Sequence, residues 1–195
     1  MIIAVIGHKG GTGKSTTAIH LAAYCQGKAP TLLIDSDLGR SCLGWANRGS
    51  LPFKVVDVEA GEAIAKDYQH IILDTPARIS PPELRDLSRD CDLLILPSTP
   101  DIMALSSLFD LIGELPQNCK FKVLLTMIPP VGSAGEDARD TIVAEGIPIF
   151  AGEIRRLGAF QKAALLGVVV SEVKGEKFRT IAWHCYRTVG REMLP

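Results

Sequence analysis

Short apolar runs alternate with segments of helical periodicity along the whole chain. The runs are rich in Val, Ile and Leu and have the length of buried strands; they cover residues 2–6, 31–37, 53–58, 70–77, 92–97, 121–128 and 147–152. The segments between them are predicted as helices, from residue 14 onward and over 40–48, 61–68, 81–90, 101–115, 136–146, 157–166 and 176–192. Because strand and helix alternate, we predict an α/β fold with a single domain over residues 1–195. Its sheet should be mostly parallel and twisted, with helices on both faces.

The composition fits a soluble protein with one buried sheet. The chain has 195 residues, of which 22 % are charged, and this length suffices for one domain with a full core. No apolar run approaches the roughly 18 residues of a membrane-spanning helix. We expect no signal peptide, because the first apolar run leads straight into a glycine-rich turn. The five cysteines show no CxxC spacing, which favours free thiols in a reducing cytoplasm over disulfides or a metal site.

The segment between the first strand and the first helix carries the most specific chemistry. It reads KGGTGKST, and its three glycines allow backbone angles that other residues resist. A strand, a glycine loop and a helix in this order form a phosphate cradle, in which loop N–H groups and the helix N-terminus attract the anion. Lys14 can reach the β- and γ-phosphates, and the Ser15 hydroxyl suits Mg²⁺. The residues expected to bind the nucleotide here are Lys9, Gly10, Gly11, Thr12, Gly13, Lys14, Ser15 and Thr16.

The same segment resembles the deviant Walker A box of the ParA/MinD ATPases. It misses the strict pattern GxxxxGK[ST] by one residue, because the first glycine of that pattern falls at His8, and it adds Lys9 at the start of the loop. We interpret His8 itself as a loop residue rather than a ligand or a base. Spacing alone shows Lys9 only as a second cation beside the phosphates. The resemblance implies that Lys9 crosses to the ATP of the other subunit in an ATP-bound homodimer, and that Lys9 and Lys14 are both catalytic.

Two acidic residues follow the second strand in the segment LLIDSDLGRS. A carboxylate there can lie near the γ-phosphate and hold the attacking water or the hydrated metal, although Asp35 and Asp37 could also be caps at the end of the strand. The segment resembles the DxDP stretch of the family, whose second aspartate is the hydrolytic one. The resemblance therefore implies that Asp37 is catalytic. Leu38 replaces the proline of that stretch.

The fourth strand, IILDTPA, resembles the Walker B strand of the family. Asp74 stands at the carboxyl end of this strand. We predict that it contacts Mg²⁺ through a water molecule, with Ser15 as a direct ligand. The expected cofactors are therefore ATP and Mg²⁺. Met127 and Pro129 follow the sixth strand, where the family cradles adenine, but a plain strand-to-loop transition explains them equally well.

The C-terminal fifth of the chain is basic although the net charge is −1. Residues 153–195 carry eight basic and four acidic side chains, and this segment resembles the one in which relatives pair arginines with a short helix. Arg155, Arg156 and Lys162 could bind DNA phosphates without reading sequence; the alternative is that they are solvated surface charges. In the last helix we expect a stripe of Phe178, Ile181, Cys185 and Val189 to pack on the core.

The resemblance spans nearly the whole chain and implies an ATPase that positions an intracellular cargo. ATP would join two subunits, the dimer would coat the nucleoid in the cytoplasm through non-specific DNA binding, and a cargo adaptor would stimulate slow hydrolysis. The cargo could be a plasmid or chromosome, with a ParB-like adaptor, or a protein body such as a carboxysome, with an McdB-like adaptor. The alternatives are a membrane-recruited ATPase of the MinD type, which needs a lipid-binding C-terminal helix, and a metabolic enzyme of the dethiobiotin-synthase type. We do not expect a membrane partner.

Overall fold

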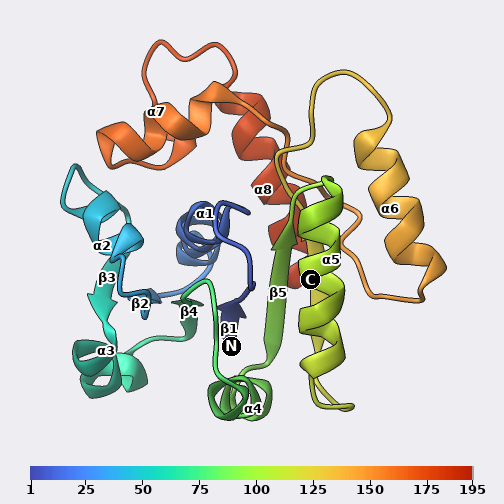
Figure 1. Cartoon of the computed structure of the whole chain (residues 1–195). Helices are drawn as coiled ribbons and strands as arrows, with labels where there is room; N and C mark the ends of the chain where they lie inside the picture. Colours follow the sequence, from blue (N-terminus) through green and yellow to red (C-terminus); the bar gives the residue numbers. More distant parts are fainter. Residues whose placement is uncertain (195) are drawn as a thin grey trace.

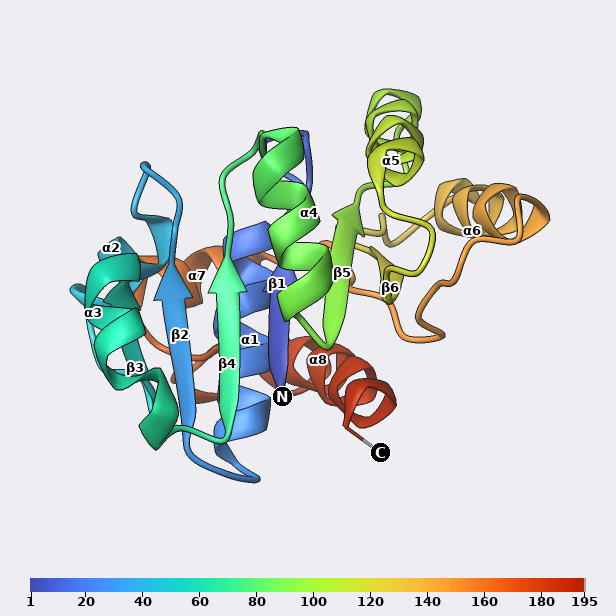
Figure 2. The ribbon, with the colours of Figure 1, turned by 90° about the horizontal axis from the view of Figure 1, so that it is seen from below.

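Six parallel strands form the centre of the molecule, and the computed structural model describes residues 1–194 (Figures 1 and 2). The strands lie in the order β3-β2-β4-β1-β5-β6. Their bounds are Ile2–Val5 for β1, Thr31–Asp35 for β2, Lys54–Asp57 for β3, His70–Asp74 for β4, Leu93–Ser98 for β5 and Phe121–Leu125 for β6. Every pairing between them is parallel. The parallel α/β fold predicted from the alternating pattern is therefore confirmed.

Within residues 1–194, eight α-helices connect the strands or follow them. They are α1 (Lys14–Gln26), α2 (Ser41–Ala46), α3 (Val58–Ile64), α4 (Pro81–Asp90), α5 (Ile102–Glu114), α6 (Ala134–Ala144), α7 (Gly158–Leu166) and α8 (Arg179–Met193). The N-termini of α3, α4 and α5 are capped by the side chains of Asp57, Ser80 and Asp101, which accept hydrogen bonds from backbone N–H groups of the first turn.

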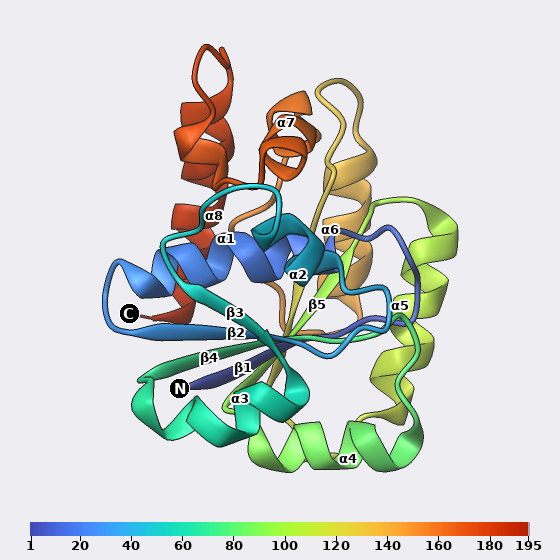
Figure 3. The ribbon, with the colours of Figure 1, turned by 90° about the vertical axis from the view of Figure 1, so that its left-hand side faces the viewer.

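The two faces of the sheet bury different side chains because successive strand residues point to opposite sides. Ile3 and Val5 pack in the cluster that contains α1, α2, α7 and α8, whereas Ala4 and Ile6 pack against α4, α5 and α6. We call the first side the α1 face and the second side the α4 face; α3 packs on the α4 face over β2 and β3. Figure 3 shows α1 and α3 on opposite sides of the strands.

Two predictions from the hydrophobic pattern are wrong in detail. Residues 147–152 form only an isolated bridge, Val123 to Ile149, rather than a seventh strand. In α8 the buried stripe contains Ala182, Cys185, Val189 and Met193, while Phe178 and Ile181 remain 41 % and 44 % exposed. The start of α8 lies at the edge of the core, so these two side chains are only partly covered while Ala182 is fully buried.

The C-terminal segment is fixed to α1 and α2 by buried polar contacts. His20 of α1 is fully buried and stacks on Tyr186 of α8, with ring centroids 4.8 Å apart. Its Nε2 accepts the Val170 N–H at 3.1 Å, so Nδ1 carries the proton and donates to the Thr16 carbonyl at 2.7 Å. The Thr17 and Tyr186 hydroxyls are 3.1 Å apart. These contacts connect the first turns of α1 to the end of the chain.

Glycine allows α2 and the turn after α7 to meet backbone to backbone. A Cβ on Gly49 would lie 2.2 Å from the Leu166 carbonyl oxygen, and one on Gly167, where φ is +67°, would lie 2.3 Å from the Gly49 nitrogen. The Trp45 indole N–H and the Arg48 Nε donate across the same junction to the carbonyls of Val168 and Ala164. Segments far apart in sequence are therefore joined at the end of α2.

Candidate nucleotide-binding site

A glycine loop at the carboxyl end of β1 opens directly into α1. Gly11 and Gly13 have φ of +81° and +86°, left-handed values that favour glycine. Gly13 is the N-cap of α1, and no side chain caps this helix or places an acid in its first turn. The first N–H groups of α1 consequently face the loop without a side-chain acceptor, the arrangement that binds phosphate at a helix N-terminus.

Lys14 extends its ammonium group into this loop. The side chain is almost buried, with 7 % exposed, and its Nζ donates to the Lys9 carbonyl at 3.3 Å. Burial lowers the Lys14 pKa, and the carboxylates of Asp74 and Asp37 act in the opposite direction. The charges of Asp37 and Asp74, two of the sequence-predicted residues, therefore act on Lys14.

Asp74 is fully buried at the end of β4 and has one oxygen without a partner. Its Oδ2 accepts a hydrogen bond from the Cys42 thiol at 3.1 Å, whereas Oδ1 has no hydrogen-bond partner among the described residues. Burial raises the Asp74 pKa to about 6, while the nearby Ser15 hydroxyl, the Cys42 thiol and the charge of Lys14 limit the rise. A buried carboxylate oxygen beside a hydroxyl fits a hard divalent cation, which prefers oxygen ligands. Sequence reasoning gave Cys42 no role here.

The two acids after β2 have different surroundings. Asp35 is buried and accepts the backbone N–H groups of Asp37, at 3.2 Å, and of Leu43, at 2.9 Å, so it fixes the turn into α2. Asp37 is half-buried, and its one side-chain hydrogen bond among the described residues is accepted from the Gly39 N–H at 3.1 Å. Asp35 therefore acts as a structural cap, which leaves Asp37 as the acid available to a ligand.

Lys9 points away from the loop and forms an ion pair with Asp101. Its Nζ lies 2.8 Å from Asp101 Oδ1, and both side chains are partly exposed. The hydrogen bonds from Lys9 and from the Thr99 hydroxyl lower the Asp101 pKa to about 2. Asp101 also accepts the Ala104 N–H as the N-cap of α5. From sequence, Asp101 was recognisable only as the first residue of a helix, because its contact with Lys9 spans 92 positions.

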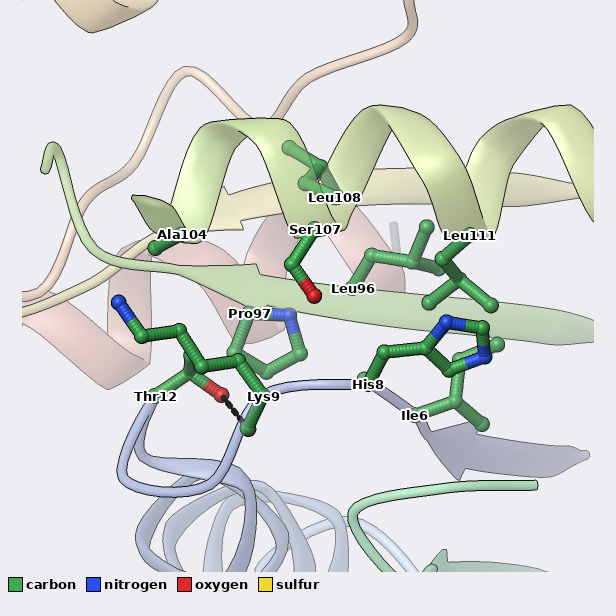
Figure 4. A pocket seen from close by; sticks show the side chains of 11 residues that line it. Ile6, His8, Lys9, Thr12, Leu96, Pro97, Ala104, Ser107, Leu108 and Leu111 are labelled. Carbon is green, nitrogen blue, oxygen red and sulfur yellow. Dashed lines mark hydrogen bonds between the residues drawn. The ribbon is translucent and has the colours of Figure 1, made fainter. Parts of the chain in front are cut away.

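The glycine loop packs closely against α5 on the side shown in Figure 4. His8 and Lys9 face Ser107, Leu108 and Leu111 across a crevice of about 10 Å³, which has room for about one water molecule and none for a nucleotide. His8 Nε2 also lies 3.7 Å from a Glu114 carboxylate oxygen. His8 is thus a loop residue with one carboxylate nearby, a contact between distant segments that the sequence did not reveal.

The end of β6 closes the opposite side of the loop. The Thr126 hydroxyl donates to the Thr12 carbonyl at 2.8 Å, and a Cβ on Gly13 would lie 3.8 Å from the Met127 Cε. Met127 has φ of +52° and is exposed, and Pro129 is half-buried. The structure thus brings Met127 beside the loop.

Comparison with known proteins agrees with this geometry. Residues 3–181 match the family model described as the CobQ/CobB/MinD/ParA nucleotide binding domain. The chain belongs to this family. It is 33 % identical over 204 residues to the maintenance of carboxysome distribution protein A of Gloeobacter kilaueensis, with 98 % of this chain and 93 % of that protein covered.

Solved structures of the family share the fold at low sequence identity. The MinD cell division protein of Aquifex aeolicus has a TM-score of 0.75 at 17 % identity, with 99 % of this chain and 96 % of that chain covered. A putative plasmid partition protein of Borrelia burgdorferi, bound to AMPPNP, has a TM-score of 0.72 at 16 % identity, with 99 % of each chain covered.

The three basic residues predicted to bind DNA differ from one another in their surroundings. Arg155 and Arg156 are exposed, and among the described residues neither forms an ion pair. Lys162 of α7 instead forms an ion pair with Glu176, which compensates its charge. The two arginines are therefore better placed for a polyanion than Lys162.

Proposed function

We propose that this chain is an ATPase that dimerises on ATP and positions an intracellular cargo. ATP would occupy the glycine loop, with its phosphates on the N–H groups of the first turn of α1 and on Lys14. Ser15 and Asp74 would hold Mg²⁺, which supplies charge neutralisation at the phosphates. The partnerless Asp74 oxygen supports this assignment. Asp37 would orient the attacking water.

One observation carries the proposed dimer. Lys9 lies at the mouth of the loop, and exposed large apolar side chains stand on three other segments that follow the carboxyl ends of strands. These are Leu38 after β2, Ile102 and Met103 at the start of α5, and Met127 and Val131 after β6. Such apolar patches mark protein interfaces. A second copy docked on this surface would bury them and would receive Lys9 once the ion pair with Asp101 opens.

The cargo and its attachment are proposed from the family. The exposed arginines 155 and 156 would hold the dimer on nucleoid DNA in the cytoplasm, and an adaptor protein on the cargo would stimulate slow hydrolysis. The similarity to a carboxysome distribution protein favours a protein body of that kind as the cargo. A lipid-bound form is disfavoured, because α8 packs the apolar side chains of Cys185, Val189 and Met193 in the core. None of the described helices has the length and apolar character of a bilayer span.

Size-exclusion chromatography with ATP and Mg²⁺ tests this proposal. The wild type should elute as a dimer, Lys14→Ala should bind no ATP and stay monomeric, and Lys9→Ala should bind ATP without dimerising. Asp37→Ala should accumulate as the ATP dimer. Lys54→Ala, which removes an exposed lysine from β3, is the matched control and should behave as wild type. ATP-dependent dimers of Lys9→Ala, or normal turnover by Asp37→Ala, would refute the respective role.

A further inference from the structure

A groove of about 540 Å³ lies on the α4 face, between α3 and α4. In Figure 2 both helices cover the sheet, and the ribbon of β4 runs between them with no helix in front of it. The floor of the groove is apolar and includes Ile71 and Leu73 of β4, Ile34 of β2 and Leu87 of α4. Ile71 and Leu73 are only partly buried, while Ile72 between them points to the α1 face and is fully buried.

The rim of this groove is acidic. Glu83, Asp86 and Asp90 line it from one side of α4, where their spacing of three and four residues places them on one face of the helix. Glu62 lines it from α3, and no basic side chain belongs to the lining. Arg89 pairs with Asp86 at 3.2 Å and with Asp90 at 2.7 Å, yet these two side chains remain 62 % and 59 % exposed. Together, residues 58–67 and 81–90 carry six acidic and three basic side chains.

We propose that this groove docks an amphipathic helix of a partner protein, apolar on one face and rich in Lys and Arg on the other. The apolar face would cover Ile71 and Leu73, and the basic side chains would meet the acids of α3 and α4. A partner strand cannot pair here, because β4 already pairs with β1 and β2 and has no free edge. The acidic rim repels nucleic acid and anionic lipid.

The groove is separate from the nucleotide loop, but it reaches the two segments that carry Asp37 and Asp74 of the nucleotide site. No residue of the glycine loop lines it, whereas Ser36, Thr75 and Pro76 do. Ser36 follows Asp35, and its hydroxyl donates to the Asp74 carbonyl at 2.8 Å. The docking site therefore stands whether or not the chain hydrolyses ATP, and its occupant would contact the backbone beside Asp37 and Asp74.

Methyl NMR on the nucleotide-free protein tests docking directly. The probe is a synthetic peptide of 18 residues with Leu at positions a and d of a helical repeat and Lys at the others. We expect the methyl signals of Ile34, Ile71, Leu73 and Leu87 to shift on titration, while those of Ile72 on the α1 face stay in place. A peptide with Glu in place of Lys should cause no shift. Shifts of Ile71 that grow with protein concentration alone would assign the groove to a second copy of the chain and overturn the proposal.

A charge-reversed variant supplies the second measurement. Glu62→Lys combined with Asp86→Lys should weaken peptide binding roughly tenfold in fluorescence anisotropy, because two attractive charges become repulsive. Asp140→Lys combined with Glu145→Lys makes the same change of net charge in α6 and at its C-cap and should leave binding unchanged. Equal weakening in both variants would show non-specific attraction to an acidic protein. That result, or the absence of shifts in the groove, would refute the docking site.

Discussion

The two faces of the sheet differ in how completely they are covered. On the α1 face one continuous cluster joins the strands to α1, α2, α7 and α8. On the α4 face the buried side chains fall into two separate clusters, one under α4, α5 and α6 and a small one under α3. The helix that opens the nucleotide loop belongs to the continuous cluster. The face that holds this helix is thus the more completely packed one, and the other leaves partly buried apolar side chains on the sheet.

The largest expected difference in stability between the two faces comes from replacing Tyr186 and Tyr68. Tyr186 is fully buried on the α1 face beside His20 and Thr17, while Tyr68 is half-buried at the α3 cluster. Tyr186→Ala should lower the free energy of unfolding by about 3–5 kcal/mol, the usual loss for a large aromatic side chain in a core. Tyr68→Ala should cost less than about 2 kcal/mol. Urea denaturation at pH 7 measures both, and equal losses would contradict the contrast between the faces.

His20 on the α1 face and Asp74 in the nucleotide site are both buried, and their titration should change the free energy of unfolding in opposite directions as pH falls. Burial lowers the pKa of His20 to about 4, so stability present above pH 6.5 is lost as pH falls toward 4. Burial raises the pKa of Asp74 to about 6, so stability is gained as pH falls below 6. From pH 7 to pH 5 we expect a loss of about 2 kcal/mol from His20 and a gain of about 1 kcal/mol from Asp74.

Replacing His20 or Asp74 should remove its part of the pH dependence of the unfolding free energy and leave that of the other residue. Relative to wild type, the unfolding free energy of His20→Gln should rise by about 2 kcal/mol between pH 7 and pH 5. That of Asp74→Asn should fall by about 1 kcal/mol over the same range. Urea denaturation without nucleotide and with a chelator measures both, and His184→Gln, which changes an exposed histidine of α8, is the control. Parallel pH profiles of His20→Gln and wild type would show that the buried imidazole does not titrate in this way.

The sequence was informative where structure depends on neighbouring residues. The β-branched run of residues 2–5, the glycines of the loop and the acids at the ends of β2 and β4 were predicted because each is set by local pattern or by strand direction. Contacts between distant segments were not predictable: Asp101 with Lys9, Cys42 with Asp74, and Glu176 with Lys162. Periodicity also could not tell which turn of α8 reaches the core, so Phe178 and Ile181 were assigned to it wrongly.

The smallest expected effect compares two neighbouring residues of one strand. Ile72 is fully buried on the α1 face, whereas Ile71 is only partly buried in the groove of the α4 face. Ile72→Val should lower the unfolding free energy by about 1 kcal/mol, because it removes one methylene from a filled core. Ile71→Val should change it by less than about 0.5 kcal/mol, because water already reaches that side chain. Valine keeps the preference for a strand in both variants, so the pair isolates packing. An equal loss of unfolding free energy for Ile71→Val and Ile72→Val would mean that α3 and α4 close over β4 in solution. The docking groove would then have no accessible apolar floor.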